Sequence, residues 1–178
     1  MPKSVDIVIP VLNEAHVLER SVAALRAFLL EGFPYHWRIV IASNGSTDGT
    51  GELGRRLSEQ YNGVAILSLP QPGRGQALRR AWTHSGADAV CYMDVDLSTD
   101  LASLRPLIDA IFEEGFDVAV GSRLLPGSRT NRSIRREAIS RIYNWIVWLA
   151  FRTKVRDAQC GFKAASRMTV DTIVPRVV

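Results

Sequence analysis

Two aspartates, Asp94 and Asp96, stand one residue apart directly after the apolar run of residues 88–93. That run is short and follows Ser85-Gly86, which is typical of a buried β-strand. Side chains at positions i and i+2 of an extended chain point the same way, so both carboxylates can face one point beyond the strand. Two carboxylates this close repel each other unless a cation lies between them. Hard oxygen ligands of this kind bind Mg²⁺ or Mn²⁺, together with the phosphates of a substrate.

A purely structural role is the alternative for the same pair. Asp is a favoured helix cap and a helix is expected from about Leu101, so Asp94 or Asp96 can be explained as a cap alone. The Asp-x-Asp spacing is a weak signal by itself. Its position at the carboxyl end of a predicted strand favours a site, because open α/β sheets bind their ligands there.

The elements that position the pair alternate between strand and helix. Apolar runs predict strands at residues 5–12, 37–42, 64–69, 88–93 and 117–120. Helical spacing of apolar residues predicts helices that end near residues 30, 61, 85 and 114. Pro10, near the end of the first run, indicates either an edge strand or a strand terminus. The alternation with short loops predicts one α/β domain with a doubly wound, mostly parallel sheet.

The loops that follow the predicted strands carry polar, charged or Gly-rich residues. Turn chemistry explains Gly45 and Gly73, but it explains neither the Asp pair nor the arginines. The carboxyl ends of parallel strands share one edge of a sheet, so these loops are expected to converge there. The loops are Asn13-Glu14, 43–48, 71–75, 94–98 and Ser122-Arg123.

Charge is concentrated in one part of the chain. The 178 residues carry a net charge of +4, and residues 123–156 hold nine Lys or Arg against one acidic residue, Glu137. Such a basic block favours phosphate-bearing partners or an anionic membrane surface. No RNA- or DNA-binding signature accompanies it, so we expect no nucleic-acid partner.

The segment of residues 133–153 is expected to form an amphipathic basic helix that carries Trp145 and Trp148. Such a helix can lie in a membrane interface or pack on the sheet with a solvated basic face, and both interpretations stay open. No apolar run is long enough to span a bilayer, and because the N-terminus is expected to lead straight into a strand, we expect no signal peptide. Cys91 and Cys160 fit no metal-binding spacing, which favours a reducing compartment and a buried, inert Cys160 thiol.

Six motifs in this order and spacing resemble the family-2 glycosyltransferases over nearly the whole chain. The likeness is strongest to dolichol-phosphate mannose synthases and bacterial polyprenyl-phosphate hexose synthases. The resemblance implies a GT-A fold, a nucleotide-sugar donor, an Mg²⁺ or Mn²⁺ cofactor and inverting transfer of one sugar to a membrane lipid phosphate. The motifs are VIPVLNE (8–14), NGSTD (44–48), GRGQA (73–77), MDVDLS (93–98), VGSR (120–123) and DAQCGFK (157–163).

The resemblance also implies roles for individual residues. Asp94 is expected beside the sugar or ribose, whereas Asp96 binds the metal with Asp94 and Ser98 as further ligands. Asp48 is expected to order its turn and cap the next helix. The nucleotide-sugar contacts are Pro10, Leu12, Asn13, Glu14, Ser43, Asn44, Asp48, Arg74, Asp94 and Val95. The residues expected to face the leaving or acceptor phosphate are Arg123, Arg136, Gln159 and Lys163. The expected catalytic residues are Asp94, Asp96, Arg123 and Arg136.

The chain departs from the family pattern in three places. Ser43-Asn44 replace two acidic residues, which leaves the choice between uracil and guanine open. Arg74 replaces the usual Lys and offers a planar fork instead of a point charge. Family members continue well past the Cys-Gly-Phe-Lys motif, so residues 1–178 are expected to be a catalytic domain that is C-terminally incomplete relative to the family.

The resulting expectation is transfer of a hexose, mannose or glucose, from GDP or UDP to a polyprenyl phosphate by an enzyme peripheral to the cytoplasmic face of the membrane. A soluble or polysaccharide acceptor is the first alternative, and a truncated, non-catalytic nucleotide-binding domain is the second. An oxidoreductase of Rossmann type is disfavoured because no GxGxxG follows the first strand. No particular oligomeric state is predicted.

Overall fold

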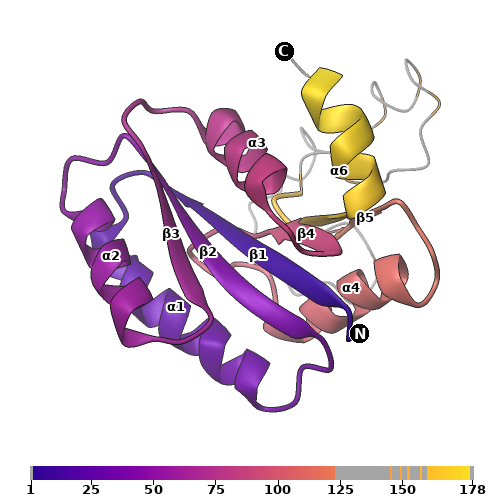
Figure 1. Cartoon of the computed structure of the whole chain (residues 1–178), viewed down its shortest axis with the longest axis horizontal. Coiled ribbons are helices and arrows are strands. Elements are labelled where there is room, and N and C mark those ends of the chain that lie inside the picture. The colour runs from indigo at the N-terminus through magenta and orange to yellow at the C-terminus, as the bar shows by residue number, and fades with distance from the viewer. Residues whose placement is uncertain are drawn as a thin grey trace.

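A six-stranded, mostly parallel sheet forms the centre of the molecule, with strand order β3-β2-β1-β4-β6-β5 (Figure 1). The computed structural model describes residues 2–122, 145, 149, 152, 157 and 160–176. The pairs β1–β2, β2–β3 and β1–β4 are parallel, and β6 runs antiparallel to both β4 and β5. The strands are β1 (Ser4–Val11), β2 (His36–Asn44), β3 (Val64–Leu69), β4 (Ala89–Tyr92), β5 (Val118–Val120) and β6 (Lys163–Ser166).

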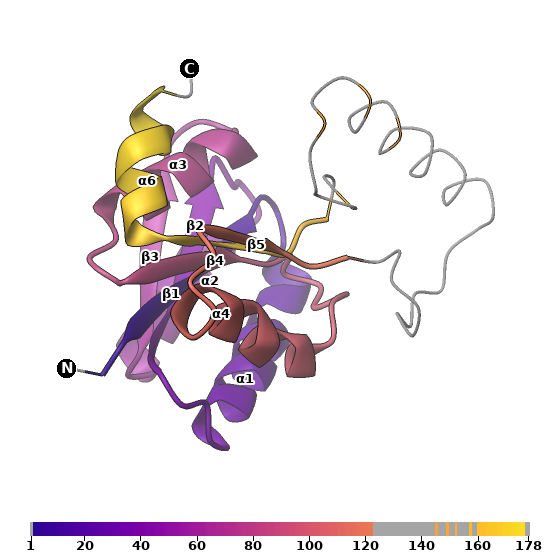
Figure 2. The same ribbon diagram turned by 90° about the vertical axis from the view of Figure 1, so that its right-hand side faces the viewer.

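Helices cover both faces of this sheet, as the predicted doubly wound architecture requires (Figures 1 and 2). One face carries α1 (Ala15–Leu30), α2 (Thr50–Gln60) and α4 (Leu104–Phe112), the last preceded by the 3₁₀ turn η1 (Leu101–Ser103). The other face carries α3 (Arg74–His84), α6 (Arg167–Ile173) and the 3₁₀ turn η2 (Val174–Arg176). No helix among the described residues has both the length and the apolar character needed to cross a bilayer.

Strand alternation divides the core into two layers. Val5, Ile7, Ile9 and Val11 of β1 point into the larger layer, beneath α1, α2 and α4. Val8 points to the opposite face, where the small residues of α3 pack against the sheet. Helices pack on both faces of the sheet, so both ends of each loop at the carboxyl edge are held by packed strands and helices.

Pro10 lies near the terminus of β1 and not on an edge strand, because β1 has β2 and β4 as neighbours. The Met93 N–H donates to the Val8 carbonyl at 3.1 Å, so backbone groups of even-numbered β1 residues face β4. The β4 ladder ends at the Val8–Tyr92 pair. The N–H that Pro10 lacks would therefore find no strand beside it.

Four elements differ from the sequence-based prediction. Strand β2 runs through Asn44, so Ser43 and Asn44 are buried strand residues and not turn residues; pairing with Val11 on one side and Leu69 on the other extends the strand. The helix predicted over 101–114 begins as a 3₁₀ turn and ends at Phe112. Strand β6 and helix α6 were not predicted, because KAAS contains no β-branched residue and is a strand only through pairing with β4 and β5.

The predicted basic helix is described at few positions. Trp145 and Leu149 are helical and exposed, at 61% and 59% of their surface. Residues four apart lie on one side of a helix, so these two apolar side chains share an exposed stripe. The remaining positions of 133–153, Trp148 included, lie outside the described residues except Arg152.

Candidate nucleotide and metal site

A cleft of about 400 Å³ opens at the carboxyl edge of the parallel strands. The segments after β1, β3 and β4 and the last residue of β2, Asn44, contribute to it, so the predicted convergence at this edge is confirmed for these segments. The size is within the range of small-molecule sites. The lining residues are Pro10, Leu12, Glu14, Asn44, Gly73, Arg74, Asp94, Val95 and Asp96.

Asp94 and Asp96 both line this cleft, although the chain turns just past β4: the Leu97 N–H donates to the Asp94 carbonyl at 3.2 Å and closes a turn over Val95 and Asp96. Met93 and Val95 are buried, at 1% and 7% exposure, whereas Asp94 is partly exposed and Asp96 is exposed. The Ser98 N–H donates to Asp96 Oδ1 at 3.0 Å and holds that carboxylate at the rim. The two aspartates therefore line one cleft, but they do so through a turn and not through the extended conformation that the sequence-based prediction assumed.

Helix capping does not explain the pair. The residue that caps η1 is Asp100, whose Oδ1 accepts the Ala102 N–H at 3.0 Å. Neither Asp94 nor Asp96 accepts a hydrogen bond from that helix among the recorded contacts of the described residues. The capping alternative is wrong for this chain.

Arg74 and Gly161 hold Asp94 from two sides. Arg74 is the first residue of α3, and its Nη2 donates to Asp94 Oδ1 in an ion pair. A Cβ on Gly161 would lie 3.0 Å from Asp94 Cγ, so only glycine allows this approach of the 160–162 segment. Gly161 belongs to one of the six motifs, but nothing in the motif indicates which residue it contacts.

Asp48 ties together the starts of two helices. Its Oδ2 accepts the Ala15 N–H at 3.2 Å, and its Oδ1 accepts the Thr50 N–H at 3.0 Å and the Thr50 hydroxyl. The hydrogen bond from the Thr50 hydroxyl is the main cause that lowers the pKa of Asp48. Asp48 is not among the cleft-lining residues, and its predicted turn-ordering role is confirmed.

Hydrogen bonds of Asn13, Ser43 and Asn44 connect the segments around the cleft, and Asn44 itself lines it. Asn13 is in the left-handed region, with φ 56°, and its Oδ1 accepts the Thr47 N–H at 2.8 Å. The buried Asn44 donates to the Val11 carbonyl at 2.8 Å and accepts the Gly73 N–H at 3.0 Å. Ser43 Oγ bonds to Ser46 Oγ at 3.2 Å. The predicted nucleotide contacts of these residues stay predictions.

Close backbone packing fixes the adjacent loop. Gly45 has φ 73°, and a Cβ there would lie 2.6 Å from the Pro72 nitrogen. Its N–H donates to the Leu69 carbonyl at 2.9 Å. The turn after β2 is thus pressed against the loop that carries Gly73 and Arg74 into the cleft.

Lys163 and Tyr92 are paired on neighbouring strands next to the residues of the cleft. Lys163 begins β6 directly opposite Tyr92, and its Nζ donates to the Cys160 carbonyl at 2.9 Å. Tyr92 was not predicted as a site residue, although its position two before Asp94 places it on the same side of the chain.

Cys91 and Cys160 are both buried, and burial raises the pKa of the Cys91 thiol. Arg123, Arg136 and Gln159 lie outside the described residues.

The carboxylate oxygens that line the cleft fit a hard divalent cation. Three carboxylates, those of Glu14, Asp94 and Asp96, line the cleft against one cationic side chain, Arg74. Within the described ranges, no three acidic, His or Cys side chains gather closely enough to ligate an ion by themselves. One or two carboxylates completed by ligand phosphates is the usual Mg²⁺ arrangement, and Asp96 is the exposed carboxylate that suits it.

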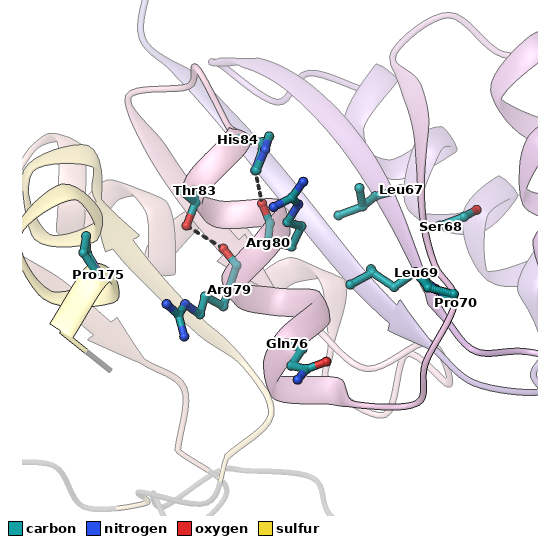
Figure 3. Close-up of a pocket in the computed structure, with 10 residues that line it drawn as sticks. All are labelled: Leu67, Ser68, Leu69, Pro70, Gln76, Arg79, Arg80, Thr83, His84 and Pro175. Carbon is teal, nitrogen blue, oxygen red and sulfur yellow. Dashed lines mark hydrogen bonds between the residues drawn. The ribbon is translucent and has the colours of Figure 1, made fainter. Parts of the chain in front are cut away.

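A larger hollow of about 670 Å³ lies on the outer side of α3 (Figure 3). Figure 3 shows Arg79 extending toward Pro175 and Arg80 toward Leu67, so the hollow spans the exposed face of the helix. Its lining residues include Arg79, Arg80 and His84 and no carboxylate. Although it is larger, it lacks ligands for a hard cation, so the cleft at the carboxyl edge is the better candidate for phosphate chemistry.

The strand order, the one antiparallel strand β6 and the Asp pair at the carboxyl edge together define a fold of the GT-A nucleotide-sugar transferase type. The sequence model of the family described as "Glycosyl transferase family 2" matches residues 6–174. The chain belongs to glycosyl transferase family 2.

Curated relatives cover the chain almost completely. Glycosyltransferase AglD of Haloferax volcanii is 34% identical over 171 residues, which are 95% of this chain and 27% of that protein. The dolichyl-phosphate beta-glucosyltransferase of Saccharomyces cerevisiae is 27% identical over 96% of this chain and 57% of its own length. The undecaprenyl-phosphate 4-deoxy-4-formamido-L-arabinose transferase of Salmonella paratyphi A is 29% identical over 97% and 51%, respectively. The chain thus spans between about a quarter and just over half of these relatives.

Solved structures show the same fold. Glucosyl-3-phosphoglycerate synthase from Mycobacterium tuberculosis, in complex with Mn²⁺, UDP and phosphoglyceric acid, superposes with a TM-score of 0.66 at 26% identity, over 93% of this chain and 56% of that one. Mannosyl-3-phosphoglycerate synthase from Rubrobacter xylanophilus gives a TM-score of 0.67 at 19% identity, over 93% and 53%. The second likeness concerns the fold alone.

Proposed function

We propose that this domain transfers a hexose from a nucleoside diphosphate sugar to a polyprenyl phosphate, with Mg²⁺ or Mn²⁺ as cofactor and with inversion. The observation that carries the proposal is the pair Asp94 and Asp96 in a nucleotide-sized cleft at the carboxyl edge of the sheet. The relatives that act on dolichyl and undecaprenyl phosphates support the acceptor class.

The cleft offers a distinct surface to each part of the donor. Pro10 and Leu12 provide an apolar wall for the base or ribose, and Glu14 adds a polar contact. Leu12 is 42% exposed although it is apolar, which suits a surface that a ligand covers. The diphosphate is then directed toward Arg74 and Asp96. The Mn²⁺ and UDP bound by the glucosyl-3-phosphoglycerate synthase support this arrangement and make UDP the first donor to test.

Charge stabilisation is the main task of the site, because cleavage of the sugar–phosphate bond leaves negative charge on the nucleoside diphosphate. A divalent ion held by Asp96 and the diphosphate would offset that charge. Arg74 places a guanidinium at the same cleft, and we assign Arg123 and Arg136 the same task.

The acceptor needs no strong general base. A phosphate monoester is already ionised near neutral pH and can attack the sugar directly. The described lining of the cleft contains no histidine, which is consistent with that chemistry. We assign Lys163 and Gln159 to the acceptor phosphate or sugar, so that catalysis rests on positioning and electrostatics.

A soluble phosphorylated acceptor is the second candidate. The glucosyl-3-phosphoglycerate synthase, whose structure contains phosphoglyceric acid, favours it. A polyprenyl acceptor instead requires access to a membrane, and the exposed pair Trp145 and Leu149 supports peripheral attachment, which we place at the cytoplasmic face. The third possibility is a domain that binds nucleotide without turnover.

Thermal denaturation of the purified chain tests the donor site. UDP, GDP and their sugars are each added with and without Mn²⁺, because a ligand that binds only the folded state raises the midpoint. We expect a metal-dependent rise with one of the bases, and Asp96→Asn should remove the metal-dependent part. Asp100→Asn is the matched control, since Asp100 is an exposed carboxylate four residues away that caps η1. Equal midpoint rises in Asp96→Asn and the wild type would refute the metal assignment.

Turnover then separates the acceptor classes. Polyprenyl phosphate in detergent and 3-phosphoglycerate are compared as acceptors with the donor that the thermal assay identifies. Transfer to the lipid phosphate supports the first proposal, and transfer only to 3-phosphoglycerate supports the second. Metal-dependent nucleotide binding without transfer to either acceptor would favour the non-catalytic domain.

A further inference from the structure

Two cationic side chains lie over the ring of Tyr92, one from the start of α3 and one from β6. The Arg74 guanidinium carbon is 5.5 Å from the centroid of the Tyr92 ring, and the Lys163 ammonium is 5.7 Å from the same centroid. Both distances are within the range of cation–π attraction. None of the roles assigned above uses this ring.

The fold produces this arrangement by three independent connections. Tyr92 is the last residue of β4, and Lys163 is its direct partner on the antiparallel strand β6. Arg74 reaches the ring from the start of α3, where it also pairs with Asp94. Trp82 of α3 packs on Tyr92 with ring centroids 6.3 Å apart and restricts its movement.

The ring, and not the hydroxyl, makes these contacts. Among the described residues, the Tyr92 hydroxyl has no recorded hydrogen bond, and it is not one of the buried polar atoms without a partner. The negative face of an aromatic ring attracts cations, so it offsets part of the repulsion between two positive groups held close together.

We propose that Tyr92 is a positioning residue that holds Arg74 and Lys163 on one aromatic ring at a fixed separation. The inference rests on the proposed function, in which Arg74 meets the donor diphosphate and Lys163 the acceptor phosphate. The transfer must bring these two anionic groups together. Cations already fixed at the correct spacing reduce the cost of that approach, because less reorganisation is needed during the reaction.

Substitutions that separate the ring from the hydroxyl test the proposal. Tyr92→Leu removes the aromatic face, whereas Tyr92→Phe keeps it. We expect Tyr92→Leu to lower kcat/KM by about 10- to 100-fold, with the loss shared by kcat and the acceptor KM. The Phe variant should restore most of that loss. Tyr92→Met, an unbranched apolar replacement, serves if the Leu variant does not fold.

A double-mutant cycle distinguishes positioning from general packing. In a Lys163→Gln background, Tyr92→Leu should cost less than half of its logarithmic effect in the wild type, because the group that it positions is gone. Equal effects in both backgrounds, or equal losses in Tyr92→Phe and Tyr92→Leu, would overturn the proposal. A merely structural role predicts the same loss in every background.

Nucleotide affinity keeps the inference separate from the proposed function. If the wild-type chain binds UDP or GDP but transfers no sugar, the double-mutant cycle is measured with nucleotide affinity in place of kcat/KM. The second substitution is then Arg74→Gln in place of Lys163→Gln. Coupling between Tyr92 and Arg74 supports the positioning role, and additivity refutes it. If the wild type binds neither nucleotide, the proposed function fails, and the inference fails with it.

Discussion

Replacing Gly161 by alanine should damage the site without unfolding the protein. The new Cβ would lie nearest to Asp94 Oδ2, and it would also lie 3.0 Å from Asp94 Cγ and 3.2 Å from Oδ1. Carbon atoms pack at about 3.5–4.0 Å and Oδ2 is in the closest conflict, so the carboxylate must withdraw by about 1 Å. Any such shift disturbs the ion pair with Arg74 and the position of Asp94 in the cleft, because the added methyl group meets the same carboxylate that forms the ion pair.

The expected loss follows from that displacement. A misplacement of about 1 Å at a reacting centre costs about 100-fold in rate, which corresponds to about 2.7 kcal/mol of transition-state stabilisation. Stability should change by less than about 1 kcal/mol, because the φ of Gly161 is not in the left-handed region and the strained atom is the end of a side chain. Alanine also lowers the entropy of the unfolded chain, which opposes any loss.

The assay compares kcat/KM, the Mn²⁺-dependent midpoint rise with nucleotide and the midpoint without ligand. Gly86→Ala is the matched control, because a Cβ there meets no atom within 4 Å and its backbone is also outside the left-handed region. Gly161→Ala with wild-type turnover would show that Asp94 does not need its observed position. A large drop in the ligand-free midpoint would instead assign Gly161 a structural role.

Two further predictions concern stability. Asp48→Asn should lower the thermal midpoint at neutral pH, since the carboxylate accepts hydrogen bonds from the first residues of α1 and α2. Folding lowers the pKa of Asp48, so the stability advantage of the wild type is complete above about pH 4 and is lost as the pH falls through the folded-state pKa. Thermal midpoints of both proteins measured at several pH values test this. Arg38→Met should lower the free energy of unfolding in urea by about 2–3 kcal/mol, because it removes two hydrogen bonds from the buried Asp6. The loss is smaller than for a fully buried pair because the Arg38 side chain is 47% exposed. Arg55→Met, in an exposed ion pair, should change little, and a loss as large as that of Arg38→Met would contradict the burial argument.

Short-range patterns determined much of the fold and part of the site. The alternation of apolar runs and helical spacing predicted five of the six strands and the helices between the first five. The position of Asp94 and Asp96 directly after a predicted strand already placed both at the carboxyl edge of the sheet, although they reach one cleft through a turn that was not predicted. The polar loops could be assigned to one edge, because parallel strands leave no other choice. These inferences depend only on neighbouring residues, whose geometry the backbone fixes.

Contacts between distant segments were decided by the tertiary structure alone. The ion pair of Arg74 with Asp94, the close approach of Gly161 and the cations on the Tyr92 ring all join different loops or strands. Strand β6 has no strand-forming sequence of its own, and Asn44 was expected in a turn until β2 was seen to continue through it. The periodicity of apolar residues in a sequence indicates which face of the sheet a side chain occupies, but it does not indicate which strand pairs with which. That choice depends on the packing of the whole sheet, and it places Lys163 opposite Tyr92.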